Sequence, residues 1–431
     1  MTRSSISVSA SRARFEAAAL ALARERGADL VFSAPGCPAR TEPVVGVDPV
    51  AELVFDEGTT PDDIREFCFG TPGPALGFIS YSYGMLLRGV ASAKARRFPL
   101  GHLKKYAARV EFDADGERAL VFSADPALRG ELAARIEAAP EHTAVEPVRG
   151  LPRRAPESSL GRAGYEAGVR ETLARIRGGH TYQLNLSTRF SWTCPDLDPL
   201  ALWASLWRRH PAPFYAWFSS GGHRVLSTSP ERFLRVADGR VLSQPIKGTL
   251  RFDAPAPGLA ERLTGSAKEA AELSMIVDLI RNDISAHCAY GSVRVENHKS
   301  VFAVDNLLQM YADVRGELRP GSDCLDLFLD AFPGGSVTGC PKRRSMEIIE
   351  ELEPHARELF CGSMVVVRDE RTLDSSIAIR TALFDAASGR LDVYAGSGIV
   401  VDSVPASEYE ETLAKAEKFL DAAKIFDTEA T

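Results

Sequence analysis

The sequence lacks the features of several broad classes of protein. No apolar run in its 431 residues is long enough to span a bilayer, so no membrane partner is predicted. No basic tract and no interleaving of aromatic with basic residues accompanies the net charge of -7, which disfavours a nucleic-acid partner. The seven cysteines are scattered and none forms a Cys-x-x-Cys pair, so neither a zinc site nor a disulfide framework is indicated. Such thiols fit a reducing, cytoplasmic location.

What is present is typical of a globular protein. Hydrophobic residues make up 45% and charged residues 25% of the chain, enough for one large domain or two to three smaller ones. Residues 1–150 predict a mixed α/β subdomain without obvious chemistry. Residues 139–160 are rich in Pro, Arg, Glu and Ser, which indicates a surface linker. The chemistry is therefore expected after residue 160.

A predicted hairpin joins an acid to an amine. Asp238-Gly239 lies between two apolar-rich runs and favours a two-residue turn. Counting outward from that turn pairs Glu231 with Ile246, which makes Lys247 a near neighbour of Glu231 unless Pro245 shifts the register. Such a pair can supply a proton donor and a nucleophile, and it can equally be an ordinary cross-strand ion pair.

Two predicted helices each carry two carboxylates three residues apart. Ser266 begins the first helix, in which Glu269 and Glu272 share a face beside an apolar stripe. Glu408 and Glu411 repeat this spacing near the C-terminus. Carboxylates suit Mg²⁺, which binds one or two of them and retains several waters. The alternative is four surface glutamates.

Four further stretches place polar side chains or glycines among apolar residues. Residues 181–190 alternate as a strand with Gln183, Asn185 and Ser187 on one face, lining a pocket or facing solvent. Residues 332–342 form a Gly-rich loop before a helix. Arg380 lies inside a strand pattern, where a charge needs a partner, and Gly396 and Gly398 offer backbone N–H groups to an anion. Together these stretches indicate a substrate with more than one carboxylate.

The order of these motifs resembles that of the chorismate-utilising enzymes, which include anthranilate, aminodeoxychorismate, isochorismate and salicylate synthases. The resemblance covers about residues 160–425, and residues 1–150 match it loosely. It is carried by Ser229-Pro-Glu-Arg, Pro245-Ile-Lys-Gly-Thr, Met275-Ile-Val-Asp-Leu-Ile-Arg-Asn-Asp, Phe332-Pro-Gly-Gly-Ser-Val-Thr-Gly-Cys-Pro-Lys, Ile379-Arg-Thr, Gly396-Ser-Gly-Ile-Val and Glu408-Tyr-Glu-Glu-Thr. The fold it implies is α+β, with two large, mainly antiparallel β-sheets packed face to face, helices outside, and the N-terminal part integrated with the catalytic region.

Two positions sort the family's members. The members that add water to chorismate carry Lys where this chain has Gln183, and the amine-adding members carry Gln. The anthranilate type has Ala where this chain has Lys247, and the aminodeoxychorismate type has Lys. The resemblance therefore implies amination at C4 of chorismate to 4-amino-4-deoxychorismate, a product for folate or for a specialised metabolite such as an antibiotic.

The resemblance also implies a role for each matched residue. Lys247 would attack C2 of chorismate, and Glu231 would protonate the departing C4 hydroxyl. Gln183 would hold ammonia. Glu272 and Glu411, supported by Glu269 and Glu408, would bind Mg²⁺ against the substrate. Substrate contacts are expected from Thr249, Ser336, Phe360, Arg380, Gly396, Gly398 and Lys415.

The chain departs from the family at a few positions. Gln309 stands where the family has a His beside the leaving hydroxyl, and a Gln can form hydrogen bonds but cannot transfer a proton. Phe360 replaces a Tyr or Trp. No glutaminase Cys motif is found, so ammonia is expected from a separate glutaminase subunit or from solution. The alternatives are C2 amination, to anthranilate or 2-amino-2-deoxyisochorismate, and a weakly active scaffold that docks a glutaminase.

Overall fold

The structure, a computed structural model, describes residues 5–34, 41–113, 115, 117–141, 148–152, 154–252, 256–304 and 307–425. The helices are α1 (Arg12–Arg26), α2 (Pro61–Phe69), α3 (Tyr81–Leu87), α4 (Pro126–Ala138), α5 (Arg162–Arg177), α6 (Pro199–Arg209), α7 (Leu259–Thr264), α8 (Ala267–Ser285), α9 (Cys324–Ala331), the short 3₁₀ turn η1 (Gly335–Val337), α10 (Lys342–Leu352) and α11 (Pro405–Ile425).

The strands alternate with these helices along the chain. They are β1 (Ser5–Ser9), β2 (Asp29–Phe32), β3 (Val44–Phe55), β4 (Ala75–Ile79), β5 (Gly101–Asp113), β6 (Arg118–Ser123), β7 (Glu157–Ser158), β8 (Gln183–Thr193), β9 (Phe214–Ser220), β10 (His223–Ser229), β11 (Arg232–Ala237), β12 (Arg240–Ser243), β13 (Ile246–Arg251), β14 (Arg294–Val304), β15 (Leu307–Glu317), β16 (Gly339–Cys340), β17 (Ser363–Asp369), β18 (Thr372–Ile377), β19 (Thr381–Asp385) and β20 (Arg390–Ile399).

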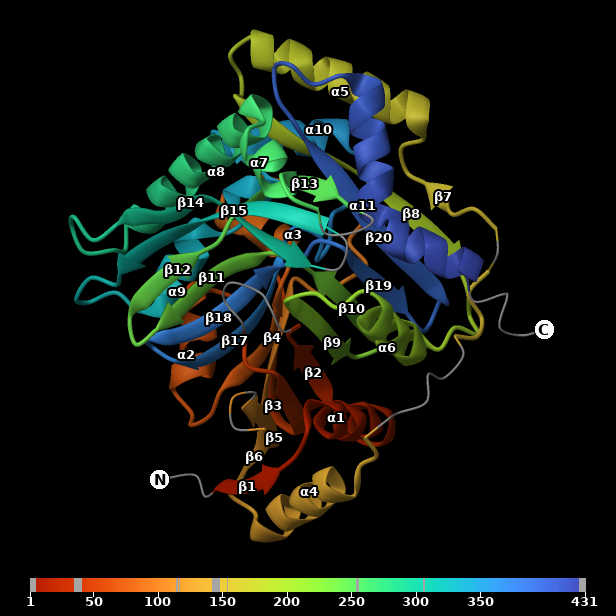
Figure 1. The fold of residues 1–431 in the computed structure, drawn as a ribbon, viewed down its shortest axis with the longest axis vertical. Helices are drawn as coiled ribbons and strands as arrows, with labels where there is room; N and C mark the ends of the chain where they lie inside the picture. The colour runs from red at the N-terminus through yellow and green to blue at the C-terminus, as the bar shows by residue number, and fades with distance from the viewer. Residues whose placement is uncertain are drawn as a thin grey trace.

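The strands form one antiparallel network that divides into two arms at the long strands β3 and β5. The first arm runs β3-β2-β9-β10-β19-β20-β8, and the second runs β5-β4-β17-β18-β11-β12-β15-β14. Figure 1 shows the second arm on the left and the first on the right, above the N-terminal strands. The predicted α+β class with mainly antiparallel strands is confirmed, and the pairing of β3 with β5 joins the two arms into one sheet.

The arms pack face to face because their side chains alternate. On β9 and β10, Phe218 and Val225 join a buried cluster that also contains Phe233 from the second arm. Trp217 and Leu226, one residue away on each strand, point to the opposite face and pack with α1, α6 and α11. Side chains alternate between the two faces of a strand, and consecutive positions here are apolar, so the first arm has two buried faces.

The strand β4 is followed at once by the capped helix α3. It ends at Ile79, and the Ser80 hydroxyl accepts a hydrogen bond from the backbone N–H of Tyr83 at 3.1 Å, which caps α3. A serine side chain can satisfy one unpaired N–H of the first helical turn, so it favours a helix start over a continued strand.

Within the described residues, no helix is both long and apolar enough to cross a membrane.

Candidate active site

The hairpin turn forms where it is predicted, but its strands do not run as far as counted. Ala237 pairs with Arg240 across the turn, as expected. The ladder ends with Arg235 opposite Leu242, so the predicted pairing of Glu231 with Ile246 is wrong.

Pro245 supplies the physical reason for this break. A proline has no N–H to give to a ladder, and β12 stops at Ser243 before it. The chain then starts β13, in which Lys247 pairs with Met310 of β15. Gly248 follows at a bulge with φ 73°, a conformation that favours glycine. Lys247 therefore reaches the site from a different strand pairing than the one expected.

Glu231 is a buried acid in the connection between β10 and β11. Its side chain is 8% exposed, and its Oε1 accepts a hydrogen bond from the Ser336 hydroxyl at 3.2 Å. Burial raises the pKa of Glu231 to about 7, although Lys247 and the Ser336 hydrogen bond favour the ionised form. A carboxyl group with such a pKa can hold a proton near neutral pH and give it up, as a general acid must.

Lys247 lies among the backbone and carboxylates predicted to surround the substrate. Its Nζ is 4.0 Å from Glu272 Oε2, at the outer limit of an ion pair. A methyl group placed on Gly398 would lie 3.6 Å from the same Nζ. The amine thus faces the bare backbone of β20 in the first arm, although it comes from the second. In Figure 1, β13 lies between α8 and α11.

Three of the predicted metal ligands, Glu269, Glu272 and Glu411, lie close enough to affect one another electrostatically. Burial raises the pKa of Glu272, and the neighbouring carboxylates of Glu269 and Glu411 raise it further, while Lys247 opposes them. Burial also acts on Glu411, but Lys415, whose Nζ is 2.7 Å from Glu411 Oε1, lowers the pKa of Glu411 overall. Carboxylates from α8 and α11 are therefore close enough to repel one another.

Glu408 is more deeply placed than a surface glutamate. It is 4% exposed, and its Oε1 accepts a hydrogen bond from Ser403 at 2.7 Å. Its Oε2 is buried and has no hydrogen-bond partner among the described residues. In that part of the chain, no three His, Cys, Asp or Glu side chains are already arranged as metal ligands. Oxygen donors that repel one another, with one left unpaired, nevertheless fit Mg²⁺ completed by water and substrate.

The polar face of β8 is buried and partly unpaired. Gln183 is 7% exposed, which excludes the solvent-facing alternative for it. The side-chain Oδ1 of Asn185 is buried and has no hydrogen-bond partner among the described residues. Gln309 of β15 pairs with Thr249 of β13, and its Oε1 is likewise buried without a partner in the described chain. Unpaired buried acceptors are costly and call for a ligand or a water.

The remaining predicted substrate contacts lie at several depths. Arg380 lies between β18 and β19 with φ 49° and not inside a strand, and burial lowers the pKa of its guanidinium. No described residue forms an ion pair or hydrogen bond with that guanidinium. Lys415 Nζ donates to the Gly396 carbonyl at 3.1 Å. Phe360 is buried and stacks on Tyr394 with ring centroids 5.4 Å apart.

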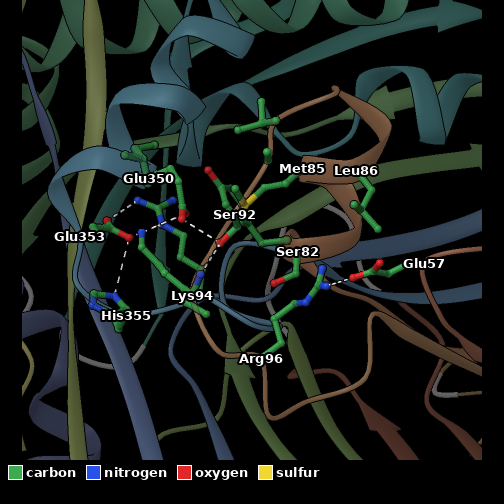
Figure 2. A pocket seen from close by; sticks show the side chains of 16 residues that line it. Glu57, Ser82, Met85, Leu86, Ser92, Lys94, Arg96, Glu350, Glu353 and His355 are labelled. Carbon is green, nitrogen blue, oxygen red and sulfur yellow. Dashed lines mark hydrogen bonds and ion pairs between the residues drawn. The ribbon is translucent and has the colours of Figure 1, made fainter.

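A cavity of about 200 Å³ lies apart from this group, and none of the predicted site residues lines it. Figure 2 shows Lys94 and Arg96 at this cavity, each paired with a carboxylate, and the side chains of Glu353 and His355. Glu353 Oε1 accepts hydrogen bonds from the backbone N–H and hydroxyl of Ser187. Glu353 therefore supports the middle of β8, four residues beyond Gln183. The sequence patterns did not reveal this cavity, because its lining residues have no characteristic spacing.

The chain belongs to the family of chorismate binding enzymes, whose model matches residues 24–421. The match includes most of the N-terminal region that the motifs left out.

Relatives with two activities resemble the chain to the same degree. Aminodeoxychorismate synthase component 1 of Salmonella typhimurium is 39% identical over 267 residues, which are 61% of this chain and 58% of that protein. Anthranilate synthase component 1 of Aquifex aeolicus is 38% identical over 264 residues, which are 61% of this chain and 53% of that protein. The chain thus covers between 53% and 58% of the length of these relatives.

Solved structures share the fold over nearly the whole chain. The anthranilate synthase component I from Streptococcus pneumoniae superposes with a TM-score of 0.77 at 27% identity, covering 90% of this chain and 94% of that one. The menaquinone-specific isochorismate synthase from Escherichia coli gives a TM-score of 0.74 at 18% identity, covering 97% and 94%, a likeness of fold alone.

Proposed function

We propose that this protein aminates chorismate at C4 to form 4-amino-4-deoxychorismate. The observation that carries the proposal is the position of Lys247, whose Nζ faces the backbone of Gly398 while the buried acid Glu231 lies within its electrostatic range. Relatives named aminodeoxychorismate synthase and relatives named anthranilate synthase match equally well, so the choice rests on residues. Lys247 with Gln183 favours the C4-aminating type.

The first step uses Lys247 as a nucleophile and Glu231 as an acid. The neutral amine of Lys247 forms a bond to C2, the two conjugated ring double bonds shift, and the C4–O bond breaks. Glu231 gives its proton to the departing hydroxyl, which leaves as water. Ser336 orients the carboxyl group, and Gln309 offers a hydrogen bond to the hydroxyl without transferring a proton.

The second step replaces Lys247 by ammonia. Ammonia held by Gln183 forms a bond to C4, both ring double bonds return to their first positions, and the C2–N bond breaks with its electron pair going to Lys247. The new C4 ammonium passes one proton to Glu231, which restores the acid. The net change consumes chorismate and ammonia and releases aminodeoxychorismate and water, with no oxidant or reductant.

Mg²⁺ is the proposed cofactor. Glu272 and Glu411 would hold it, with Glu269 and Glu408 in support, and it would neutralise a carboxylate of the substrate. The substrate's carboxylates would otherwise be repelled by these four glutamates. The remaining substrate contacts are assigned to Thr249, Phe360, Arg380, Gly396, Gly398 and Lys415.

A separate glutaminase subunit is the proposed source of ammonia. Several relatives carry the name component 1, which supports the existence of a second component. Ammonium salts at alkaline pH should replace it, because free ammonia is the reacting species. The catalytic steps above need nothing else from a partner.

The test is direct. The protein is incubated with chorismate, Mg²⁺ and ammonium chloride at alkaline pH, and the products are identified by mass spectrometry and NMR with and without an added aminodeoxychorismate lyase. A product that the lyase converts to para-aminobenzoate supports the proposal. Anthranilate or a 2-amino product would show C2 amination and overturn it, as would activity with glutamine but none with ammonium.

A further inference from the structure

Asn185 carries a buried acceptor that the reaction has not yet used. It lies on β8 two residues after Gln183, and side chains two apart on a strand share a face. Its Oδ1 is shielded from water and has no hydrogen-bond partner among the described residues. Leaving a buried carbonyl oxygen unpaired is unfavourable, so a donor is expected to occupy this position when the site is filled.

The strand register aims Asn185 at the reacting amine. Asn185 is directly opposite Gly398 in the β8–β20 ladder, so both point to one face. On that face, a methyl group on Gly398 would lie 3.6 Å from Lys247 Nζ, and one on Gly396 would lie 3.0 Å from Asn185 Oδ1. Asn185 and Lys247 thus both border the bare backbone of these two glycines. The Oδ1 of Asn185 has no partner among the described residues, so it stays available to a ligand.

We propose that Asn185 Oδ1, together with Gln183, binds the incoming ammonia, an inference that rests on the proposed C4 amination. The substrate's carboxylates have no hydrogen to donate, and its C4 hydroxyl is assigned to Glu231. Ammonia has three N–H groups and one lone pair. When two N–H groups donate to the two amide oxygens on β8, the lone pair points away from the strand and toward the ring. Asn185 therefore orients the nucleophile of the second step.

The main chain at position 185 is held by hydrogen bonds that do not involve the Asn185 side chain. The Asn185 N–H donates to the Thr338 carbonyl at 2.9 Å, and Arg357 donates to the Asn185 carbonyl at 2.7 Å. Arg357 is itself paired with Glu353, beside the cavity of Figure 2. A substitution at position 185 therefore leaves the main-chain hydrogen bonds intact, which makes the side chain testable.

The experiment compares Asn185→Leu, Asn185→Asp and the wild type in steady-state kinetics with chorismate and ammonium varied separately. Leu has the branching of Asn with bulkier methyl groups and no acceptor, and Asp keeps an acceptor. We expect Asn185→Leu to raise the KM for ammonia by roughly 3- to 10-fold, the loss of one hydrogen bond, with the KM for chorismate unchanged. Asn185→Asp should recover most of the affinity for ammonia.

Two controls make the result decisive. Asn282→Leu makes the same change on an exposed residue of α8 and should alter neither constant. Thermal melting checks that each variant is folded, and Asn185→Ala, which is smaller and also lacks the acceptor, takes the place of Asn185→Leu if that variant folds poorly. An unchanged KM for ammonia, or a rise confined to the KM for chorismate, overturns the inference. A wild-type protein that makes no 4-amino product would overturn the proposed function instead.

Discussion

Replacing Glu231 by Gln should abolish turnover and yet stabilise the protein at alkaline pH. Glutamine keeps the shape of the side chain and an oxygen that accepts from Ser336, but it has no proton to give. Loss of a general acid typically costs about 10²- to 10⁴-fold in rate. The stability effect has the opposite sign, because the wild-type chain must bury a carboxylate once the pH exceeds the pKa of Glu231.

The magnitude follows from the pKa. Burial raises the pKa of Glu231 from 4.5 to about 7, so the folded chain binds this proton more tightly than the unfolded chain. The tighter binding of this proton contributes fully to the free energy of unfolding below pH 4.5, and the contribution is lost as the pH rises through about 7. The full shift corresponds to roughly 3 kcal/mol, and about 2 kcal/mol of it falls between about pH 5.5 and about pH 8.5.

Urea unfolding of both proteins, followed by tryptophan fluorescence across that pH range, measures this difference. The stability of Glu231→Gln relative to the wild type should increase with pH by about 2 kcal/mol. Glu353→Gln is the matched control, a buried Glu for which Arg357, His355 and Ser187 outweigh burial and lower the pKa. It should be destabilised by an amount that does not vary over this range. A pH-independent difference for Glu231→Gln would refute the reasoning.

Two further predictions concern the amine and the metal. Lys247→Arg should not restore the activity lost in Lys247→Ala, because a guanidinium stays protonated and is a poor nucleophile. Product analysis decides this, and near-native formation of aminodeoxychorismate by Lys247→Arg would return Lys247 to the role of an ion-pair partner. Lys247→Ala resembles the anthranilate type, so traces of a 2-amino product are expected from it. Glu272→Gln and Glu411→Gln should each lose activity while keeping the wild-type melting temperature, and excess chelator should do the same to the wild type. Full activity in chelator would contradict the Mg²⁺ assignment.

The local elements could largely be predicted from the sequence. The turn at Asp238-Gly239 and the start of α8 after Ser266 depend on nearby residues, namely a turn dipeptide and a hydroxyl that accepts from the Glu269 N–H. Apolar alternation likewise predicted a strand in residues 181–190, seen as β8. Such signals act over a few residues, so they survive without tertiary contacts.

The surroundings of each candidate residue could not be obtained in this way. Counting along one hairpin placed Lys247 opposite the region of Glu231, whereas Pro245 ends that ladder and β15 receives Lys247 instead. The predicted strand position of Arg380 was also wrong, because the chain turns there with a positive φ. Pairing partners from distant parts of the chain decide both outcomes, and local patterns do not encode them.

The sequence by itself determined which candidate groups this protein carries: the Lys in Pro245-Ile-Lys-Gly-Thr, the acid of Ser229-Pro-Glu-Arg and the paired glutamates. Only the tertiary structure decided their chemistry. The pKa of Glu231 is raised because both arms exclude water from it, and Glu272 and Glu411 repel each other because α8 and α11 meet across β13. The acceptor of Asn185 is unpaired, and Gly398, the residue opposite it on β20, has no side chain that could donate to it. Burial and charge proximity are properties of packing, so they arise only when distant segments come together.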